Sequence, residues 1–421
     1  MKNFLKKIIS SILIWESKLI LKKYKPSIVA VTGSVGKTST KDAIFTVLAP
    51  HGYVRKSDKS FNSELGVPLT ILGCQNGWND PFIWMKNIFE GLELIFFKSD
   101  YPSMLVLEVG ADHPGDIESV SKWLKADVVV ITKIGEVPVH VEFFPSVEAL
   151  VKEKSYLIKS LKKDGTLVLL ADDPRVSAMA EGVSQKIMTF GMASTATVTA
   201  SDSSVIYDTQ SLPDGMSFKL NYEGNSIPVM LKGILGNQQI YPLIAAATVG
   251  LSRGLSITKI VESITQHVPP RGRMNILKGM NGSVVIDDTY NSSPVALQEG
   301  LTTLASLTIP GKKIAVLGDM MELGSFSADE HRKAGVQAVQ SSNMLITVGQ
   351  RAKLMEGSVA SFNASDEAAE YLKGIVSVGD VVFVKGSQSV RMERISAALL
   401  EDPSKAGELL VRQEEEWLNK K

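Results

Sequence analysis

The segment VTGSVGKTST, residues 31–40, decides the fold of this 421-residue chain. It follows an apolar run at residues 28–31 that predicts a buried strand, and it precedes residues 41–48, which predict a helix. A strand, a glycine-rich turn and a helix in this order form a phosphate-binding loop, because the glycines admit an oxyanion and the helix start offers free N–H groups. Lys37 can then reach the outer phosphates and Thr38 can ligate Mg²⁺. An ordinary glycine-rich turn with a surface lysine is the weaker alternative.

The composition excludes several classes of protein. Lysine plus arginine and aspartate plus glutamate both number 45, so the chain has no basic surplus for a general nucleic-acid binder. Its one cysteine, Cys74, leaves no internal disulfide and no cysteine-rich zinc site, and it suits a reducing cytoplasm. We therefore expect a cytoplasmic globular protein of two or three domains.

Residues 1–25 alternate apolar side chains with lysines at nearly helical spacing. The longest mainly apolar run, residues 8–15, is too short to span a bilayer. Two interpretations remain. The segment is either a basic amphipathic helix packed on the next domain or on a partner protein, which we favour, or a peripheral helix at the inner face of the membrane.

The remaining chain predicts an α/β fold in two parts. Residues 26–270 hold buried strands near 28–31, 104–109, 127–132 and 166–170, and then alternating stretches that predict a small antiparallel sheet attached to the parallel one. A Pro-Pro-Arg-Gly linker follows, and the β/α pattern restarts in residues 271–421, which predicts a Rossmann-like domain. The strands expected in this second part lie at 283–288, 313–318, 344–349 and 380–385.

Three further residues stand where chemistry is expected. Glu108 ends a buried strand, where it could hold Mg²⁺ directly or through water. His140 follows another strand, and Lys154 lies on a predicted helix. From spacing alone, His140 could equally be a capping or core residue and Lys154 a solvated one.

Several separated motifs together resemble the Mur ligase family, over about residues 28–398. The most similar members join D-alanyl-D-alanine to a muramoyl-tripeptide. The motifs are TGSVGKTST (32–40), FNSELGVPLT (61–70), LEVGADHPGDI (107–117), His140 with Lys154, GRMN (272–275), IDDTYNSSP (286–294), LGDMMELG (317–324) and VKGSQS (384–389).

The resemblance implies an ATP-dependent amide ligase of peptidoglycan synthesis that works through an acyl phosphate with two Mg²⁺ ions. It implies a monomer whose substrates are D-alanyl-D-alanine and a muramoyl-peptide carrier. The catalytic residues would be Lys37, Glu108, His140, Lys154 and Arg273, and the metal ligands Thr38, Glu108, His140 and a carbamylated Lys154. ATP would contact Gly33, Ser34, Val35, Gly36, Lys37, Thr38, Ser39, Gln239, Arg273 and Asp288. The other substrates would contact Asn62, Glu64, Asn291, Lys385 and Ser387.

The sequence departs from the family pattern in three places. The phosphate loop begins at residue 32, so the usual N-terminal UDP-binding domain has no counterpart in the 25 residues that precede the first unit. A His-Asn pair of the family is Gln238-Gln239 here, and an arginine often found in the last motif is Gln388. The two other hypotheses are a ligase of the same superfamily for a different acceptor or amino acid, and a non-catalytic nucleotide-binding partner protein. Joint retention of Lys37, Glu108, His140 and Lys154 argues against the second.

Overall fold

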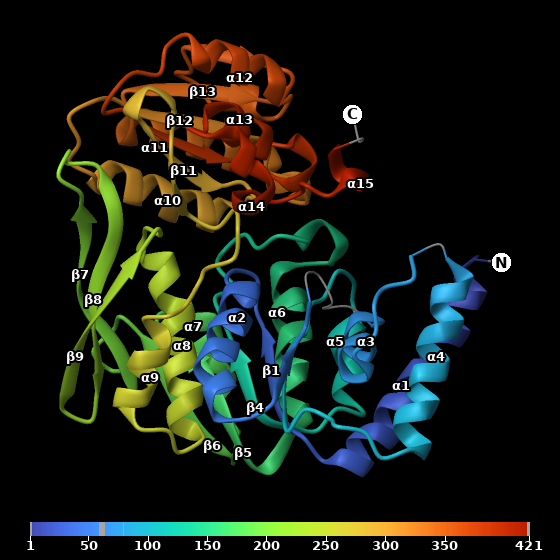
Figure 1. Cartoon of the computed structure of the whole chain (residues 1–421). Helices are drawn as coiled ribbons and strands as arrows, with labels where there is room; N and C mark the ends of the chain where they lie inside the picture. The colour runs from blue at the N-terminus through green and yellow to red at the C-terminus, as the bar shows by residue number, and fades with distance from the viewer. Residues whose placement is uncertain (1, 59–63, 79, 419–421) are drawn as a thin grey trace.

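The computed structural model describes residues 2–58, 64–78 and 80–418, with side chains from residue 8 onward. Two sheets, each flanked by helices, account for most of it (Figure 1). The α/β class predicted from the sequence is confirmed. Within the described residues, no helix is both long and apolar enough to cross a bilayer.

The first sheet has nine strands in the order β2-β3-β1-β4-β5-β6-β7-β8-β9. Neighbours from β2 to β7 pair in parallel, and β7, β8 and β9 pair antiparallel. The predicted antiparallel strands therefore extend the parallel sheet without a break. The strands are β1 (Ser27–Thr32), β2 (Val54–Lys56), β3 (Met104–Glu108), β4 (Ala126–Ile131), β5 (Leu161–Leu170), β6 (Lys186–Gly191), β7 (Val198–Tyr207), β8 (Pro213–Tyr222) and β9 (Asn225–Lys232).

Helices cover both faces of this sheet because its central strands are apolar on both sides. Residues 28–31 and 105–108 are all buried, as continuous apolar runs require. α2 and α8 pack together on one face, and α5 and α6 lie on the other (Figure 1). The principal helices of this unit are α2 (Lys37–Leu48), α3 (Gly66–Leu72), α4 (Pro81–Phe96), α5 (Asp116–Ser121), α6 (Val147–Ser155), α7 (Pro174–Ser177), α8 (Asn237–Ser252) and α9 (Ile257–Ile264).

The second sheet has the order β10-β11-β15-β12-β13-β14, parallel except for β10. Helices α10 and α11 bury one of its faces, and α12 and α13 bury the other. Its strands are β10 (Asn275–Lys278), β11 (Val284–Asp288), β12 (Lys313–Gly318), β13 (Met344–Val348), β14 (Ala360–Phe362) and β15 (Val381–Lys385). Its helices are α10 (Pro294–Ser306), α11 (Ser327–Ser341), α12 (Ser365–Lys373) and α13 (Glu393–Leu399), and α14 (Ala406–Leu409) and α15 (Glu415–Leu418) follow.

The basic N-terminal segment forms α1 (Lys2–Tyr24), which packs against α3 and α4. Leu13 and Ile20 are fully buried there. Lys23 Nζ lies 2.8 Å from the carbonyl oxygen of Leu94, near the C-terminus of α4, where a cation is favourable. In the structure, the described side chains of this helix pack on its own chain.

Candidate functional site

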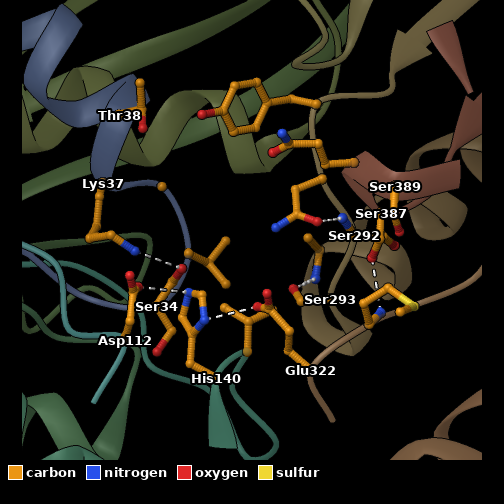
Figure 2. A pocket seen from close by; sticks show the side chains of 18 of the residues that line it. Ser34, Lys37, Thr38, Asp112, His140, Ser292, Ser293, Glu322, Ser387 and Ser389 are labelled. Carbon is orange, nitrogen blue, oxygen red and sulfur yellow. Dashed lines mark hydrogen bonds and ion pairs between the residues drawn. The ribbon is translucent and has the colours of Figure 1, made fainter. Parts of the chain in front are cut away.

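A cavity of about 940 Å³ lies between the two sheets and is lined from both of them (Figure 2). The carboxyl ends of β1, β3 and β4 face it, since Val31 pairs with Glu108 and Thr32 with Ile131. Ligands of open α/β sheets bind at such strand ends. The lining residues from the first unit include Ser34, Val35, Gly36, Lys37, Thr38, Glu108, Asp112 and His140, and those from the second include Arg273, Tyr290, Asn291, Glu322, Arg351 and Ser387.

The glycine-rich loop takes the shape that the sequence predicts. Gly36 has φ 84° and precedes α2, whose first residue is Lys37. At Gly33, where φ is 147°, a Cβ atom would collide with the Thr132 hydroxyl, so only glycine fits. The Ser34 and Val35 amides donate to the carbonyl oxygen of Lys133 at 2.8 and 2.9 Å. An anion would therefore meet the first-turn amides of α2, which have no acceptor within the helix.

Two cations, Lys37 at the start of α2 and Arg273 just before β10, converge on this cavity from the two units. Burial lowers the pKa of Lys37, Arg273 lowers it further, and Glu108 and Asp112 oppose the shift. Arg273 lies over the Tyr290 ring, 4.2 Å from its centroid. Its Nε atom and the Ser34 hydroxyl are buried without a hydrogen-bond partner in the described part of the chain. Buried polar groups are normally paired, so a cavity with such groups and two converging cations fits a polyphosphate.

His140 connects the two units. Its Nδ1 lies 2.8 Å from Glu322 Oε2, and its Nε2 lies 3.9 Å from Asp112 Oδ1 (Figure 2). The hydrogen bond from His140 lowers the pKa of Glu322. A proton on Nδ1 satisfies Glu322 and leaves the Nε2 lone pair for a metal ion, the usual way in which a carboxylate orients a ligating histidine. His140 precedes the short helix at Val141–Phe143, but its side chain makes no capping hydrogen bond and is 24% exposed, so neither the capping nor the core interpretation holds.

Lys154 is buried, with 2% exposure, so its interpretation as a solvated surface lysine is wrong. Burial lowers its pKa well below the ordinary value and Lys37 lowers it further, whereas Asp112 and Glu153 oppose the shift. Glu153 is engaged elsewhere, because its carboxylate accepts from the amides of residues 115, 117 and 118. Lys154 is not one of the residues that line the cavity. The charges of Lys37 and Asp112, which do line it, nevertheless shift the pKa of Lys154.

Three of the four residues predicted to bind Mg²⁺ lie together in the structure, and the fourth does not. Thr38, Glu108 and His140 line one cavity, and Lys154 lies behind it. Among the described side chains, no group of three or more His, Cys, Asp or Glu is placed to hold a metal ion. The set fits Mg²⁺ if Lys154 supplies carboxylate-like oxygens, because hard cations take oxygen ligands.

Asp288 and Lys385, for which the resemblance implies contacts to ATP and to the other substrates, lie next to each other in the structure. They form a buried ion pair at 2.6 Å, and Lys385 Nζ also donates to the carbonyl oxygen of Asn291 at 2.9 Å. Neither side chain lines the cavity, whereas Asn291 and Ser387 do. The pair follows from the register, since β11 and β15 lie side by side with Asp288 opposite Lys385.

Other predicted contacts also lie away from the cavity lining. Ser39 is buried inside α2, and Gln239 is buried in the first turn of α8. The Glu64 carboxylate accepts from the Ser10 hydroxyl of α1 at 2.9 Å. Asn62 lies outside the described residues. Gly33, Ser39, Glu64 and Gln239 are absent from the lining of this cavity.

Sequence reasoning assigned no role to several lining residues, among them Asp112, Tyr290, Glu322 and Arg351. Asp112, Tyr290 and Glu322 stand inside motifs that the resemblance already singled out. The cavity also has an aromatic rim, Trp78 from the loop before α4 and Trp417 from the C-terminal segment, which no motif indicated.

Comparison with known proteins identifies both units. Residues 87–250 match the Mur ligase middle domain, and residues 272–388 match the Mur ligase glutamate ligase domain. The UDP-N-acetylmuramoyl-tripeptide--D-alanyl-D-alanine ligase of Mycobacterium leprae (strain TN) is 30% identical over 408 residues, which cover 89% of this chain and 74% of the relative. The Bacillus subtilis (strain 168) enzyme of the same name is 28% identical over 398 residues, covering 92% and 79%.

Solved structures agree with these sequence matches. The MurF ligase from Thermotoga maritima in complex with ADP superposes with a TM-score of 0.78 at 26% identity, covering 95% of this chain and 84% of that one. Two matched domains in the family's order, a relative at 30% identity over most of both chains and a shared fold lead to one conclusion. This chain belongs to the Mur ligase family.

Proposed function

We propose that this protein is an ATP-dependent ligase that joins D-alanyl-D-alanine to a muramoyl-tripeptide precursor in peptidoglycan synthesis. The observation that carries the proposal is the convergence of Lys37 and Arg273, from different units, on one cavity with the Ser34 hydroxyl. Relatives that carry this activity in their names span the same two units.

The reaction divides into two steps. The terminal phosphoryl group of ATP passes to the acceptor carboxylate, so that the bond to ADP breaks and an acyl phosphate forms. The amine of D-alanyl-D-alanine then attacks the acyl carbon, loses a proton and expels inorganic phosphate as the amide closes. Lys37, Arg273 and the first-turn amides of α2 would stabilise the charge on the transferring group, which is most of what such transfers need from a protein. Asn291 and Ser387 would lie toward the amine substrate.

Thr38, Glu108, His140 and a carbamylated Lys154 would hold two Mg²⁺ ions, which supply charge neutralisation between the triphosphate and the carboxylate. The buried Lys154 supports this part of the proposal. Its lowered pKa favours the neutral amine, which is the form that attacks carbon dioxide. An N–C bond then forms, the nitrogen loses a proton, and the product carries the oxygen ligands that the site otherwise lacks.

We also propose that the chain acts as a monomer in the cytoplasm, peripherally at the inner face of the membrane, with division into residues 1–25, 26–270 and 271–421. The basic charge of residues 1–25 supports the membrane contact, and the separate cores of the two sheets support the division of the chain. Light scattering after gel filtration measures the molar mass in solution, which should be that of one chain, 45.6 kDa.

Replacing Lys37 by alanine should lower kcat/KM by about 10²- to 10³-fold, because one of the two converging cations is lost from the transferring phosphate. The assay measures inorganic phosphate released from ATP in the presence of D-alanyl-D-alanine and a UDP-linked or lipid-linked muramoyl-tripeptide. Lys122→Ala, which removes an exposed lysine of the same unit, should leave the rate unchanged. Tight ATP binding by the wild type without turnover on either carrier would refute the proposed ligase and favour a nucleotide-binding partner protein.

Replacing Glu322 by alanine should weaken the Mg²⁺-dependent binding of a non-hydrolysable ATP analogue by about 10- to 100-fold, because His140 loses the carboxylate that orients its ring. Isothermal titration with and without Mg²⁺ measures this effect. Glu142→Ala removes another carboxylate from the lining of the same cavity and serves as the control. Equal losses in both variants, or a loss that does not depend on Mg²⁺, would contradict the orienting role of Glu322.

A further inference from the structure

Helix α4 carries a row of exposed apolar side chains along one face. Phe82, Met85, Phe89 and Phe96 are spaced by three, four and seven residues, which places them on one side of the helix. They are 73%, 50%, 69% and 74% exposed. Single exposed apolar residues are common on protein surfaces, but three phenylalanines and a methionine along one helix face indicate a surface that contacts another apolar surface. We call these four residues the aromatic face.

The opposite side of α4 is fixed to the protein, so the aromatic face cannot turn inward. Asn87 and Gly91 are buried against α1 and its neighbours. The absence of a side chain at Gly91 leaves room for the Glu16 carboxylate, which a Cβ atom would strike. Tyr24 Oη, at the C-terminal end of α1, donates to the carbonyl oxygen of Leu94 at 3.1 Å and so holds the C-terminal ends of α1 and α4 together.

The neighbouring helix supplies positive charge. Residues 1–25 contain seven lysines and one acid, and since the whole chain is neutral, the remaining residues carry a net charge of −6. The single acid, Glu16, is buried, and burial raises its pKa to about 7, so it offsets little of that charge. Lys18 and Lys22 are exposed on α1. On α4 itself, Lys86 borders the aromatic face and Glu93 interrupts it.

The aromatic face begins at the mouth of the cavity. Trp78 lies in the loop that leads into α4, is 75% exposed and belongs to the cavity lining. Phe82 is the second residue of α4, four positions after Trp78 in the sequence. α1 and α4 lie side by side at one edge of the molecule (Figure 1). A surface that meets the aromatic face would thus lie beside the entrance through which a substrate reaches the cavity.

We propose that the aromatic face of α4 and the lysines of α1 dock this protein on an anionic lipid bilayer, with the mouth of the cavity beside the lipid surface. Aromatic side chains insert into the interface of a bilayer, and neighbouring lysines are attracted to its anionic headgroups. A second copy of the chain is the less suitable occupant, because a symmetric contact would set lysine-rich surfaces against each other. The docking deepens the proposed function and rests on it for its purpose, since it would present a lipid-anchored acceptor to the ligase.

Vesicle sedimentation of the full chain tests the docking without any turnover. Vesicles of phosphatidylglycerol mixed with phosphatidylcholine should pellet the wild type, and vesicles of phosphatidylcholine alone should pellet much less of it. The double variant Phe82→Ser and Phe89→Ser should bind the anionic vesicles at least about tenfold more weakly, because two large apolar side chains no longer enter the interface. Lys18→Glu with Lys22→Glu should weaken binding while the aromatic face is intact.

The matched control is Val336→Ser with Val359→Ser, two exposed valines of the second unit that are 60% and 57% exposed. This control should bind like the wild type. Equal recovery of the wild type and the Phe82/Phe89 variant with anionic vesicles, or no binding by either, would overturn the proposal. A fall from dimer to monomer in the Phe82/Phe89 variant, seen by light scattering, would overturn it in favour of a second copy.

Tryptophan fluorescence tests whether the mouth of the cavity lies beside the lipid surface. Lipids with brominated acyl chains should quench the tryptophan emission of the wild type, and Trp78→Phe should reduce that quenching. Quenching that is unchanged by Trp78→Phe would overturn the placement of the mouth beside the lipid. The Phe82/Phe89 variant should still release phosphate at the wild-type rate with a UDP-linked acceptor and no vesicles. A loss of membrane docking can therefore be told apart from a loss of ligase activity.

Discussion

Replacing Lys154 by alanine is expected to lower ligase turnover by at least about 10³-fold, the largest effect of any single change in this protein. Lys154 is buried, and it lies within electrostatic reach of Lys37 and Asp112 in the cavity. An ammonium group there would repel both Lys37 and a divalent cation, whereas a carbamate would bind the cation. The variant therefore loses a proposed metal ligand, and phosphate release with both substrates present measures the loss.

Lys152→Ala is the matched control, because Lys152 is exposed on the same helix, α6, and should not affect turnover. A short carboxylate such as acetate should partly restore the Lys154→Ala rate by occupying the vacated space with ligand oxygens. Depleting carbon dioxide should slow the wild type and leave the variant unchanged. Normal ligation by Lys154→Ala would show that carbamylation plays no part in the reaction.

Replacing Lys385 by methionine is expected to destabilise the second unit by about 3–5 kcal/mol, because Asp288 keeps a buried carboxylate without its cation. The two side chains are 2% and 8% exposed and lie 2.6 Å apart. Burial lowers the pKa of Lys385, and Asp288 opposes that shift. Urea unfolding followed by circular dichroism gives the loss of stability, and hydrogen exchange in β11 and β15 locates it.

The double variant Lys385→Met and Asp288→Leu should recover most of this loss, since it removes both charges together. Lys373→Met is the control, because it breaks an exposed pair with Glu370 and should cost at most about 1 kcal/mol. A loss in Lys385→Met no larger than in the control would mean that the buried pair contributes little to stability.

The regular part of the fold was predictable because its signals are local. Every strand predicted in the two sheets has a counterpart in the structure, and the loop at residues 31–40 connects a strand to a helix as expected. The strands that sequence reasoning did not identify include β2 and β14, which have three residues each and no long apolar run. β6 was also missed, as its alternation blends into the antiparallel stretch that follows.

The site was predictable only as a set of candidates. Ser34, Lys37, Thr38, Glu108, His140 and Arg273 do meet in one cavity, although they come from four separate segments of the chain. Glu322 could not be paired with His140 from the sequence, because that contact depends on how the second unit closes over the first. The partner of Asp288 could not be predicted either, since the register of β11 and β15 sets Asp288 opposite Lys385.

The sequence by itself determined the phosphate-binding loop, the order of the β/α units and the family, since glycine conformation, apolar runs and short motifs act within a few residues of one another. Tertiary structure alone decided which side chains share the cavity, which polar groups are paired within the core, and that α4 presents its phenylalanines outward beside Trp78. These outcomes depend on packing between segments far apart in the chain, where the burial of one group is set by the position of another.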